Sequence, residues 1–259
     1  MISHWEQSIL RELGPEGCEC GVKAVEKTDS TNLRLKEAAR RGEISAPYIL
    51  AADCQTAGRG RLGRSFVSPP GTGLYMSLFF VPPPYADSGN ITILAAVAVC
   101  RAIEEMTDLR PQIKWVNDLF VNGKKVCGIL AERIDEGVVV GIGVNVKTPA
   151  GGFPPEAGAA GALNADIDRG ELAGRIARHF LDGAGDPAAP AILNTYRARM
   201  LLMGRESRYN QNGQEKNARV TGVADDGGLM IETPKGPQVL RTGEVSLGSE
   251  NFDGKLSIG

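Results

Sequence analysis

The most constraining feature of the sequence is a pair of strand-length apolar runs joined by Asn122-Gly123. An Asn-Gly pair between such runs is the strongest short signal for a β-hairpin, because both residues accept the positive φ angles of a two-residue turn. The runs on either side cover residues 119–121 and 126–133. The sequence therefore predicts a sheet that is at least partly antiparallel.

Helical and strand patterns are interspersed along most of the chain. Further strands are expected at residues 48–53, 74–81, 112–116 and 138–146. Helices are expected at residues 5–13, 30–41, 91–106, 171–182 and 191–203. This mixture predicts an α+β (α/β) domain whose mixed, largely antiparallel sheet carries flanking helices. The Gly/Ala/Pro-rich stretch 148–165 is expected to be a surface loop.

The pattern changes after about Leu202, where strand-length runs become short and Gly-containing turns become frequent. Strands are expected at residues 205–210, 218–223, 229–233, 238–241 and 245–247. Five short strands in succession predict a small β barrel. We therefore expect two domains, 1–202 and 203–259, which suits a chain of 259 residues at roughly 150 residues per domain.

Composition and charge bear on the class of protein. Hydrophobic residues make up 42% and charged residues 23% of the chain, which is typical of a globular protein. The 29 Lys and Arg against 31 Asp and Glu leave a net charge of −2. We therefore expect no overall attraction to DNA or to an anionic membrane. The longest apolar helix, 91–106, contains three charged residues and is too short to cross a bilayer.

The cysteines favour a reducing compartment. There are five, an odd number without regular spacing, and no secretory leader opens the chain, so we expect a cytoplasmic protein. Cys18 and Cys20 are close in sequence, but no second ligand pair is spaced as in zinc sites. No metal site is predicted.

The segment 58–64, Gly-Arg-Gly-Arg-Leu-Gly-Arg, combines three Gly with three Arg. Glycine lets the backbone approach a ligand closely, and the forked guanidinium matches phosphate or carboxylate oxygens, so the segment suggests an anion-binding loop. It is neither a Gly-Lys-Ser/Thr phosphate loop nor a Gly-rich turn that opens a helix, because Ser-Phe-Val-Ser-Pro-Pro follows. A solvated turn remains an equally good interpretation of the segment alone.

Four other segments place polar residues at predicted element ends. Residues 114–118, Lys-Trp-Val-Asn-Asp, leave a strand and either face a ligand or form an Asx turn. Lys124-Lys125 either faces a ligand or flanks the hairpin in solvent. Residues 29–32 cap a helix and can also bind a ligand there. Two Gly and an Asn in 138–146 indicate either a bulge or close approach of a bulky group.

In this order, the segments resemble the biotin protein ligases, or biotin–[acetyl-CoA-carboxylase] ligases. The matching runs are Ser30-Thr31-Asn32, Gln55-x-x-Gly-Arg-Gly-Arg-x-Gly-Arg, Ser68-Pro69, Lys-Trp-x-Asn-Asp-Leu, Lys125-Val-Cys-Gly-Ile-Leu and Gly-Ile-Gly-Val-Asn145. Each run is weak alone, but six in the right order are highly specific. The β-rich tail lies where this family carries an SH3-like barrel.

The resemblance implies a two-step reaction. Biotin's carboxylate attacks the α-phosphate of ATP to give biotinyl-5'-AMP and pyrophosphate, and the adenylate then acylates a lysine of a biotin carboxyl carrier protein or domain. It implies biotin and ATP with Mg²⁺ as small-molecule partners, and no tightly bound prosthetic group. Because Ser30 comes so early in the chain, we expect a monofunctional ligase without an N-terminal DNA-binding domain. Relatives often dimerise, so a homodimer is an open alternative to a monomer.

The resemblance also implies roles for individual residues. Biotin would be bound by Ser30, Thr31, Asn32, Gln55, Arg59, Gly60, Arg61, Lys125 and Gly128. ATP would be bound by Arg61, Arg64, Phe66, Asn117, Lys125 and Asn145. Lys125 and Arg61 would act at the reacting centre, and Asp118 would orient or deprotonate the incoming lysine amine.

Three residues depart from the family pattern, and two other functions compete with it. Many relatives have Pro at Val116, Trp at Phe66 and Arg at Leu62, and these differences bear on ATP affinity. A lipoate ligase or octanoyltransferase would share the fold but usually lacks the Gly/Arg run. A catalytically silent module whose β barrel binds a partner or RNA is disfavoured, because the tail after residue 204 contains only Tyr209 and Phe252 as aromatics and its acids roughly balance its bases.

Overall fold

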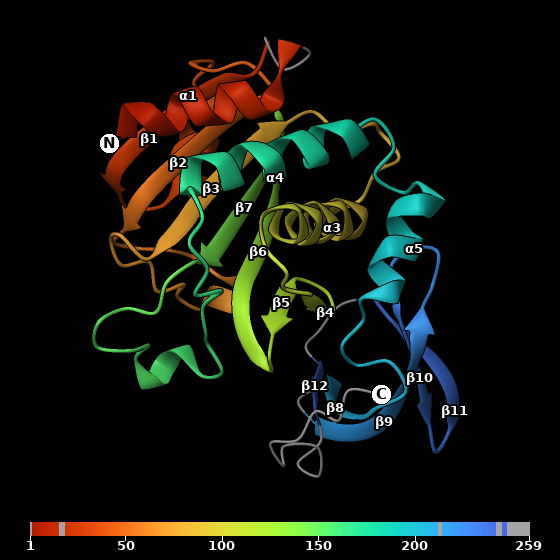
Figure 1. Ribbon diagram of the computed structural model, residues 1–259. Helices are drawn as coiled ribbons and strands as arrows, with labels where there is room; N and C mark the ends of the chain where they lie inside the picture. Colours follow the sequence, from red (N-terminus) through yellow and green to blue (C-terminus); the bar gives the residue numbers. More distant parts are fainter. Residues whose placement is uncertain (1, 16–18, 212–213, 242–244, 248–259) are drawn as a thin grey trace.

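The computed structural model describes residues 2–15, 19–211, 214–241 and 245–247 (Figure 1); Cys18 and Phe252 lie outside them. Its main sheet has the order β1-β2-β3-β7-β6-β5-β4. The strands are β1 (Gly21–Thr28), β2 (Tyr48–Gln55), β3 (Gly73–Phe80), β4 (Gln112–Lys114), β5 (Asp118–Val121), β6 (Lys124–Ile134) and β7 (Gly137–Asn145). The helices are α1 (Ile2–Leu13), α2 (Thr31–Arg40), α3 (Ser88–Met106), α4 (Arg169–Gly183) and α5 (Pro190–Ala198).

Strand pairing confirms the mixed, largely antiparallel sheet. Only β1 and β2 run parallel, and every other described pair is antiparallel. The predicted hairpin joins β5 to β6, and φ is 50° at Asn122 and 73° at Gly123. These are the left-handed values that the Asn-Gly pair tolerates.

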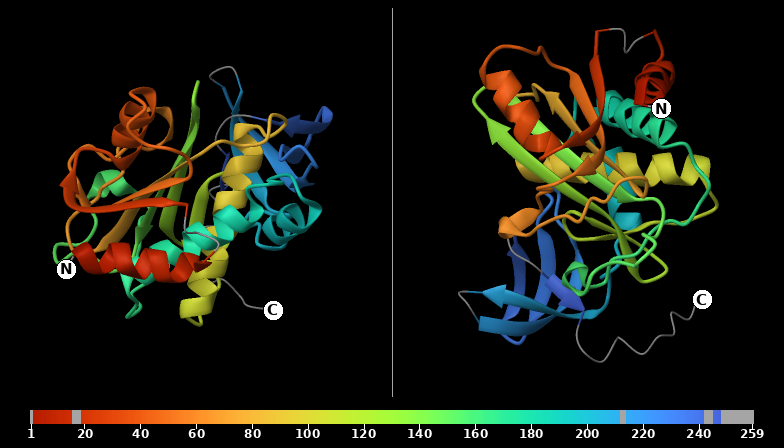
Figure 2. Two further views of the ribbon diagram at one scale, coloured as in Figure 1. Left: turned by 90° about the horizontal axis from the view of Figure 1, so that it is seen from above. Right: turned by 90° about the vertical axis from the view of Figure 1, so that its left-hand side faces the viewer.

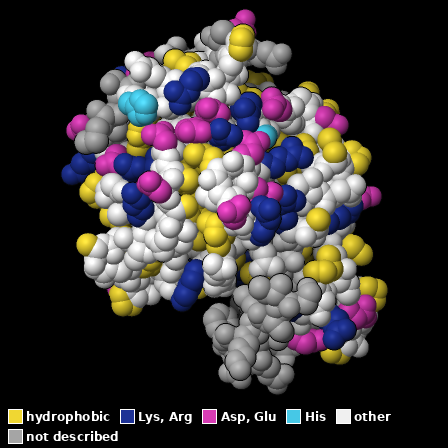
Figure 3. Space-filling view, in the orientation of Figure 1, with side chains coloured by type: hydrophobic (Ala, Val, Ile, Leu, Met, Phe, Trp, Pro, Cys, Tyr) yellow, Lys and Arg dark blue, Asp and Glu magenta, His cyan; other side chains and the backbone are white. Residues whose placement is uncertain are grey.

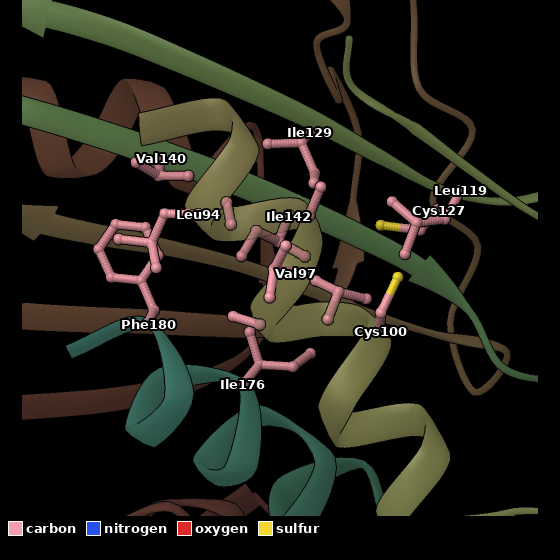
Figure 4. Close-up of a cluster of buried hydrophobic side chains, with 14 of the residues drawn as sticks. Leu94, Val97, Cys100, Leu119, Cys127, Ile129, Val140, Ile142, Ile176 and Phe180 are labelled. Atoms are coloured by element: carbon pink, nitrogen blue, oxygen red, sulfur yellow. The ribbon is translucent and has the colours of Figure 1, made fainter. Parts of the chain in front are cut away.

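Helices cover both faces of the sheet (Figure 2). α1, α3 and α4 pack on one face and α2 packs on the other. Alternate residues of β7 therefore face opposite layers, so that Val140 joins the α3 side while Val139 packs with Leu35 of α2. Figure 4 shows Leu94 and Val97 of α3 with Phe180 of α4 in the larger core.

Several predicted bounds are off by three or four residues, and two larger differences have a physical cause. β1 was missed, because it is an edge strand with only Ala24 buried and charged residues alternating around it. The carboxylate of Glu6 accepts a hydrogen bond from the Ala24 N–H at 2.8 Å, on the side that no strand covers. α5 ends at Ala198, not at residue 203, because the chain leaves the helix to pair Met200 with Ile113 of β4.

The C-terminal segment contains the five predicted strands, which form a small antiparallel sheet. Its order is β11-β10-β9-β8-β12, with β8 (Glu206–Gln211), β9 (Gln214–Val223), β10 (Leu229–Thr233), β11 (Gly236–Leu240) and β12 (Val245–Leu247). Because the described pairings put β11 and β12 at opposite ends of this order, closure into a barrel stays a prediction. The sheet contacts the larger domain through Trp115, whose Nε1 donates to the Gly227 carbonyl at 3.0 Å.

Charges are interspersed on the face that α1 and α4 present (Figure 3). Glu105 of α3 lies 3.0 Å from both Arg175 and Arg178 of α4, and 2.8 Å from His179. Mixed charge of this kind leaves no large basic field on this face. No helix among the described residues is long and apolar enough to span a membrane.

The first turn of α3 depends on a capping box. The Asp87 side chain accepts from the Asn90 N–H at 2.8 Å, and the Asn90 side chain faces the Asp87 N–H. We expect Asp87→Ala to lower the free energy of unfolding by about 1 kcal/mol, because the backbone N–H of Asn90 loses its acceptor. Urea denaturation would measure this, with the fully exposed Asp166→Ala as control. Equal stability of the two variants would contradict the prediction.

Candidate active site

A cavity of about 540 Å³ lies at the N-terminal end of α2. Every predicted site residue lines this cavity. The residues are Ser30, Thr31, Asn32, Gln55, Arg59, Gly60, Arg61, Arg64, Phe66, Asn117, Asp118, Lys125, Gly128 and Asn145. Segments that are distant in sequence thus line one cavity. Their order along the chain does not by itself reveal this proximity.

One end of the cavity is a buried network of amides and hydroxyls. Ser30 caps α2 by accepting from the Leu33 N–H at 3.4 Å, so the capping interpretation is correct for this residue. The N–H and hydroxyl of Thr31 both donate to Gln55 Oε1, at 2.9 and 3.1 Å. Gln55 Nε2 in turn donates to the Ser68 hydroxyl at 3.0 Å. The network fixes which polar atoms face a ligand.

Ser77 also belongs to this network, and sequence reasoning missed it. Its hydroxyl is fully buried and lies 2.7 Å from Thr31 Oγ1 and 2.5 Å from Asn32 Oδ1. The available signal was a hydroxyl inside the otherwise apolar strand β3. A buried polar group needs a partner, and here the partners are two of the predicted site residues, Thr31 and Asn32.

Gly141 and Gly143 of β7 admit bulky groups, as the sequence suggested. A methyl group on Gly141 would overlap the side-chain oxygen of Asn32. A methyl group on Gly143 would lie 2.5 Å from Cε1 of Phe66, whose ring also packs over Gly128. The glycines therefore allow Asn32 and Phe66 to sit directly against the sheet.

The Gly/Arg segment folds back on itself as a tight loop. The Gly60 N–H donates to the Arg64 carbonyl at 2.7 Å, and residues 61–63 form a single 3-10 turn. Leu62, at the tip, has φ of 55° and is 73% exposed. The guanidinium of Arg61 reaches across the cavity and donates to Asn117 Oδ1 at 2.9 Å. This contact brings the loop against the Lys-Trp-Val-Asn-Asp segment.

Lys125 and Asp118 meet inside the cavity. Lys125 Nζ lies 2.7 Å from Asp118 Oδ1, and Asn117 Nδ2 donates to the same carboxylate oxygen at 3.1 Å. Lys124, the preceding residue, is exposed, so the solvated alternative holds for Lys124 and not for Lys125. Five basic side chains line the cavity against two acidic ones, Asp118 and Glu156. The cavity thus favours anions.

The segment 148–165 is not simply a surface loop, which corrects the sequence prediction. Residues 156–160 line the cavity, and the Lys125 N–H donates to the Ala159 carbonyl at 2.9 Å. The Gly161 carbonyl accepts from Asn145 Nδ2 at 2.9 Å. Pattern analysis missed this role because Gly, Ala and Pro give no hydrophobic period, while the contacts are made by the backbone.

Cys127 lies within the Lys125–Gly128 motif but belongs to the core. Burial raises its pKa well above the usual value and raises that of Cys100 to about 12. Figure 4 shows the two sulfur atoms pointing toward one another between β6 and α3. Both groups therefore stay neutral thiols. Among the described residues, no group of three or more His, Cys, Asp or Glu side chains could hold a metal ion.

The backbone ahead of Asn117 is held from two sides. Tyr196 of α5 donates its hydroxyl to the Val116 carbonyl at 3.1 Å, next to the contact of Trp115 with Gly227. We expect Tyr196→Phe to lower the free energy of unfolding by about 1–2 kcal/mol, because a carbonyl oxygen is left unpaired. Thermal unfolding would measure this against the exposed Tyr85→Phe. A smaller loss for Tyr196→Phe than for Tyr85→Phe would refute it.

Comparison with known proteins decides the family. Residues 24–148 match the Biotin/lipoate A/B protein ligase family, and residues 204–248 match the Biotin protein ligase C terminal domain. The chain is 32% identical over 241 residues to the Biotin--[acetyl-CoA-carboxylase] ligase of Paracoccus denitrificans, covering 86% of this chain and 98% of that protein. The chain belongs to the biotin protein ligase family.

Other members of the biotin protein ligase family share its fold or part of its length. The structure of biotin protein ligase from Aquifex aeolicus in complex with biotin and ATP superposes with a TM-score of 0.75 at 30% identity, covering 88% of this chain and 98% of that one. The Bifunctional ligase/repressor BirA of Bacillus subtilis is 33% identical over 215 residues, 77% of this chain. The match spans 66% of BirA, just under two thirds of its length.

Proposed function

We propose that this protein is a biotin–[acetyl-CoA-carboxylase] ligase, which activates biotin with ATP and transfers it to a lysine of a biotin carboxyl carrier domain. The observation that carries the proposal is the cavity, which has a buried network of amides and hydroxyls at one end and clustered basic side chains at the other. Biotin has the matching polarity, with a ureido ring at one end and a carboxylate at the other.

The polar end suits the ureido ring. Ser30, Thr31, Asn32 and Gln55 present both donors and acceptors there. A site built to pair with N–H groups rejects analogues that lack them, because its own polar atoms would then be buried unpaired. Lipoate and octanoate have no ureido group, so this end disfavours the lipoate-ligase alternative.

The charged end suits the first reaction step. A carboxylate oxygen of biotin forms a bond to the α-phosphorus of ATP, and the bond from that phosphorus to the leaving pyrophosphate breaks. Two anions must approach each other, which fixed positive charge and exclusion of water make easier. We assign that charge to Arg59, Arg61 and Lys125, with Gly60 and Gly128 allowing close approach of the backbone.

The nucleotide is assigned to the side of the cavity beside the Gly/Arg loop. Arg64 and Lys125 would contact phosphate oxygens, while Asn117, Asn145 and the ring of Phe66 would hold the nucleoside. ATP enters as its magnesium complex, in which the phosphates themselves bind Mg²⁺. No residue of the chain is assigned to that ion.

Transfer is the second step. The acceptor amine attacks the acyl carbon of the adenylate, AMP leaves, and the amine loses a proton. Asp118 lies beside Lys125 at 2.7 Å and is placed to orient the amine or take that proton.

The same proposal covers the partners, the cellular location and the domain organisation. The partners are a biotin carboxyl carrier protein or domain, biotin and ATP, and the chain acts in the cytoplasm, where ATP and carboxylases are found. We place the boundary between the catalytic domain, 1–202, and the β domain, 203–259, at the end of the segment that pairs with β4. Analytical ultracentrifugation would distinguish a homodimer from a monomer.

ATP–pyrophosphate exchange tests the proposal directly. We expect exchange of labelled pyrophosphate into ATP only when biotin is added, and not with lipoate or octanoate. Exchange with lipoate alone would assign the protein to the lipoate ligases. If none of the three acids supports exchange, the adenylating function is overturned. RNA binding would then be the function to test.

A further inference from the structure

Glu132 of β6 lies just outside the cavity but touches a residue that lines it. Its Oε2 accepts a hydrogen bond from Asn32 Nδ2 at 2.9 Å, and its Oε1 lies 2.6 Å from Lys36 Nζ. Lys36 and Asn32 are both on α2, one turn apart. Burial acts to raise the pKa of Glu132, but the hydrogen bonds from Lys36 and Asn32 lower it below its usual value. The group is therefore an anion at neutral pH.

The two contacts on Asn32 Nδ2 determine which way its amide points. One amide proton goes to Glu132 and the other to the Leu130 carbonyl at 3.2 Å. If the amide turned over, its oxygen would face two oxygen acceptors and no donor. The Asn32 amide group also lies close over Gly141, where an added methyl group would overlap it. Its oxygen must therefore face Ser77 and the cavity.

A count of protons shows that this oxygen can still accept a hydrogen bond. The Ser77 hydroxyl has one proton, which it can give to Thr31 Oγ1 or to Asn32 Oδ1 but not to both. An amide oxygen has two lone pairs, so at least one on Asn32 has no donor in the described network. Such an acceptor in a cavity fits a ligand N–H and repels a ligand carbonyl.

We propose that Glu132 is a positioning residue, which holds the Asn32 amide so that its oxygen accepts a hydrogen bond from a ureido N–H of biotin. The inference rests on the proposed function, since it concerns the acid bound in the same cavity. Lys36 supports this arrangement by pairing with the other carboxylate oxygen. Removing the Glu132 carboxylate leaves the Leu130 carbonyl as the one remaining acceptor, among the described contacts, for the Asn32 amide protons.

The test measures the KM for biotin and the KM for ATP in the exchange assay. We expect Glu132→Ala to raise the KM for biotin by about 10- to 30-fold, as for loss of one charge-assisted hydrogen bond, and to change the KM for ATP by less than about twofold. Glu132→Gln keeps an oxygen acceptor for Asn32 and should stay within about threefold of the parent protein. Lys36→Met keeps the Glu132–Asn32 bond and should likewise have a small effect.

A double-mutant cycle separates positioning from a general structural role. If Glu132 acts through Asn32, then Glu132→Ala combined with Asn32→Ala should bind biotin no more weakly than Asn32→Ala alone. The inference is overturned if the increases in the KM for biotin of the two single variants multiply in the double variant. Equal increases in the KM for biotin and the KM for ATP in Glu132→Ala would overturn it as well. Should Glu132→Ala fail to fold, the inference stands only if Glu132→Gln is near-normal while Glu132→Met is defective for biotin. Absence of biotin-dependent exchange in the parent protein would instead refute the proposed function.

Discussion

Replacing Lys125 by Ala is expected to lower the rate of biotin-dependent ATP–pyrophosphate exchange by about 100- to 1000-fold. Lys125 carries the ammonium that faces Asp118 inside the cavity, where the carboxylate and the α-phosphate must meet. Its loss removes one positive charge and also leaves Asp118 without its closest cation. Both changes increase the repulsion between the reacting anions.

The preceding residue provides a matched control. Lys124 is exposed on the same strand, so Lys124→Ala removes the same charge from the same part of the chain without touching the cavity. We expect this variant to retain exchange within about twofold, as is usual for a surface charge. Similar rates for the two variants, with similar melting temperatures, would remove Lys125 from the reacting centre.

The parts of the fold with a strong local pattern were predictable, and the parts that depend on backbone contacts were not. The β5–β6 hairpin follows from Asn122-Gly123 alone, because few other pairs accept that turn. β1 escaped detection because an edge strand with a single buried residue has almost no hydrophobic alternation. The C-terminal end of α5 escaped because a backbone pair between Met200 and Ile113 overrides helix propensity there.

The candidate site shows the same division. Side chains that supply charge, such as Arg61 and Lys125, stand out in sequence because clustered Arg and Lys beside Gly are unusual. Ser77 and Glu132 do not, since a lone hydroxyl or carboxylate on a strand is common. Their importance comes from contacts with Asn32, which lies far from both in sequence. Likewise, the stretch 156–160 reaches the cavity only because the backbone of Lys125 holds it.

Gly143→Ala is expected to raise the KM for ATP by about 10- to 100-fold and to lower the free energy of unfolding by about 1–3 kcal/mol. The added methyl group would lie 2.5, 2.7 and 3.0 Å from three ring atoms of Phe66. The ring has little room to retreat, since it packs over Gly128 and meets Tyr75 edge-on with centroids 6.3 Å apart. It must therefore move into the space assigned to the nucleotide.

A strand glycine elsewhere in the chain separates this effect from a general effect of alanine. Gly222 of β9 has ordinary extended φ and would place its methyl group no closer than 3.5 Å to the sulfur of Met230. Gly222→Ala should therefore leave the KM for ATP unchanged. Adding Phe66→Leu to Gly143→Ala should restore part of the lost stability, because the smaller side chain relieves the overlap. If Gly143→Ala binds ATP normally while its stability falls, then Phe66 packs against the sheet without contacting the nucleotide, and its assignment to the ATP site is wrong.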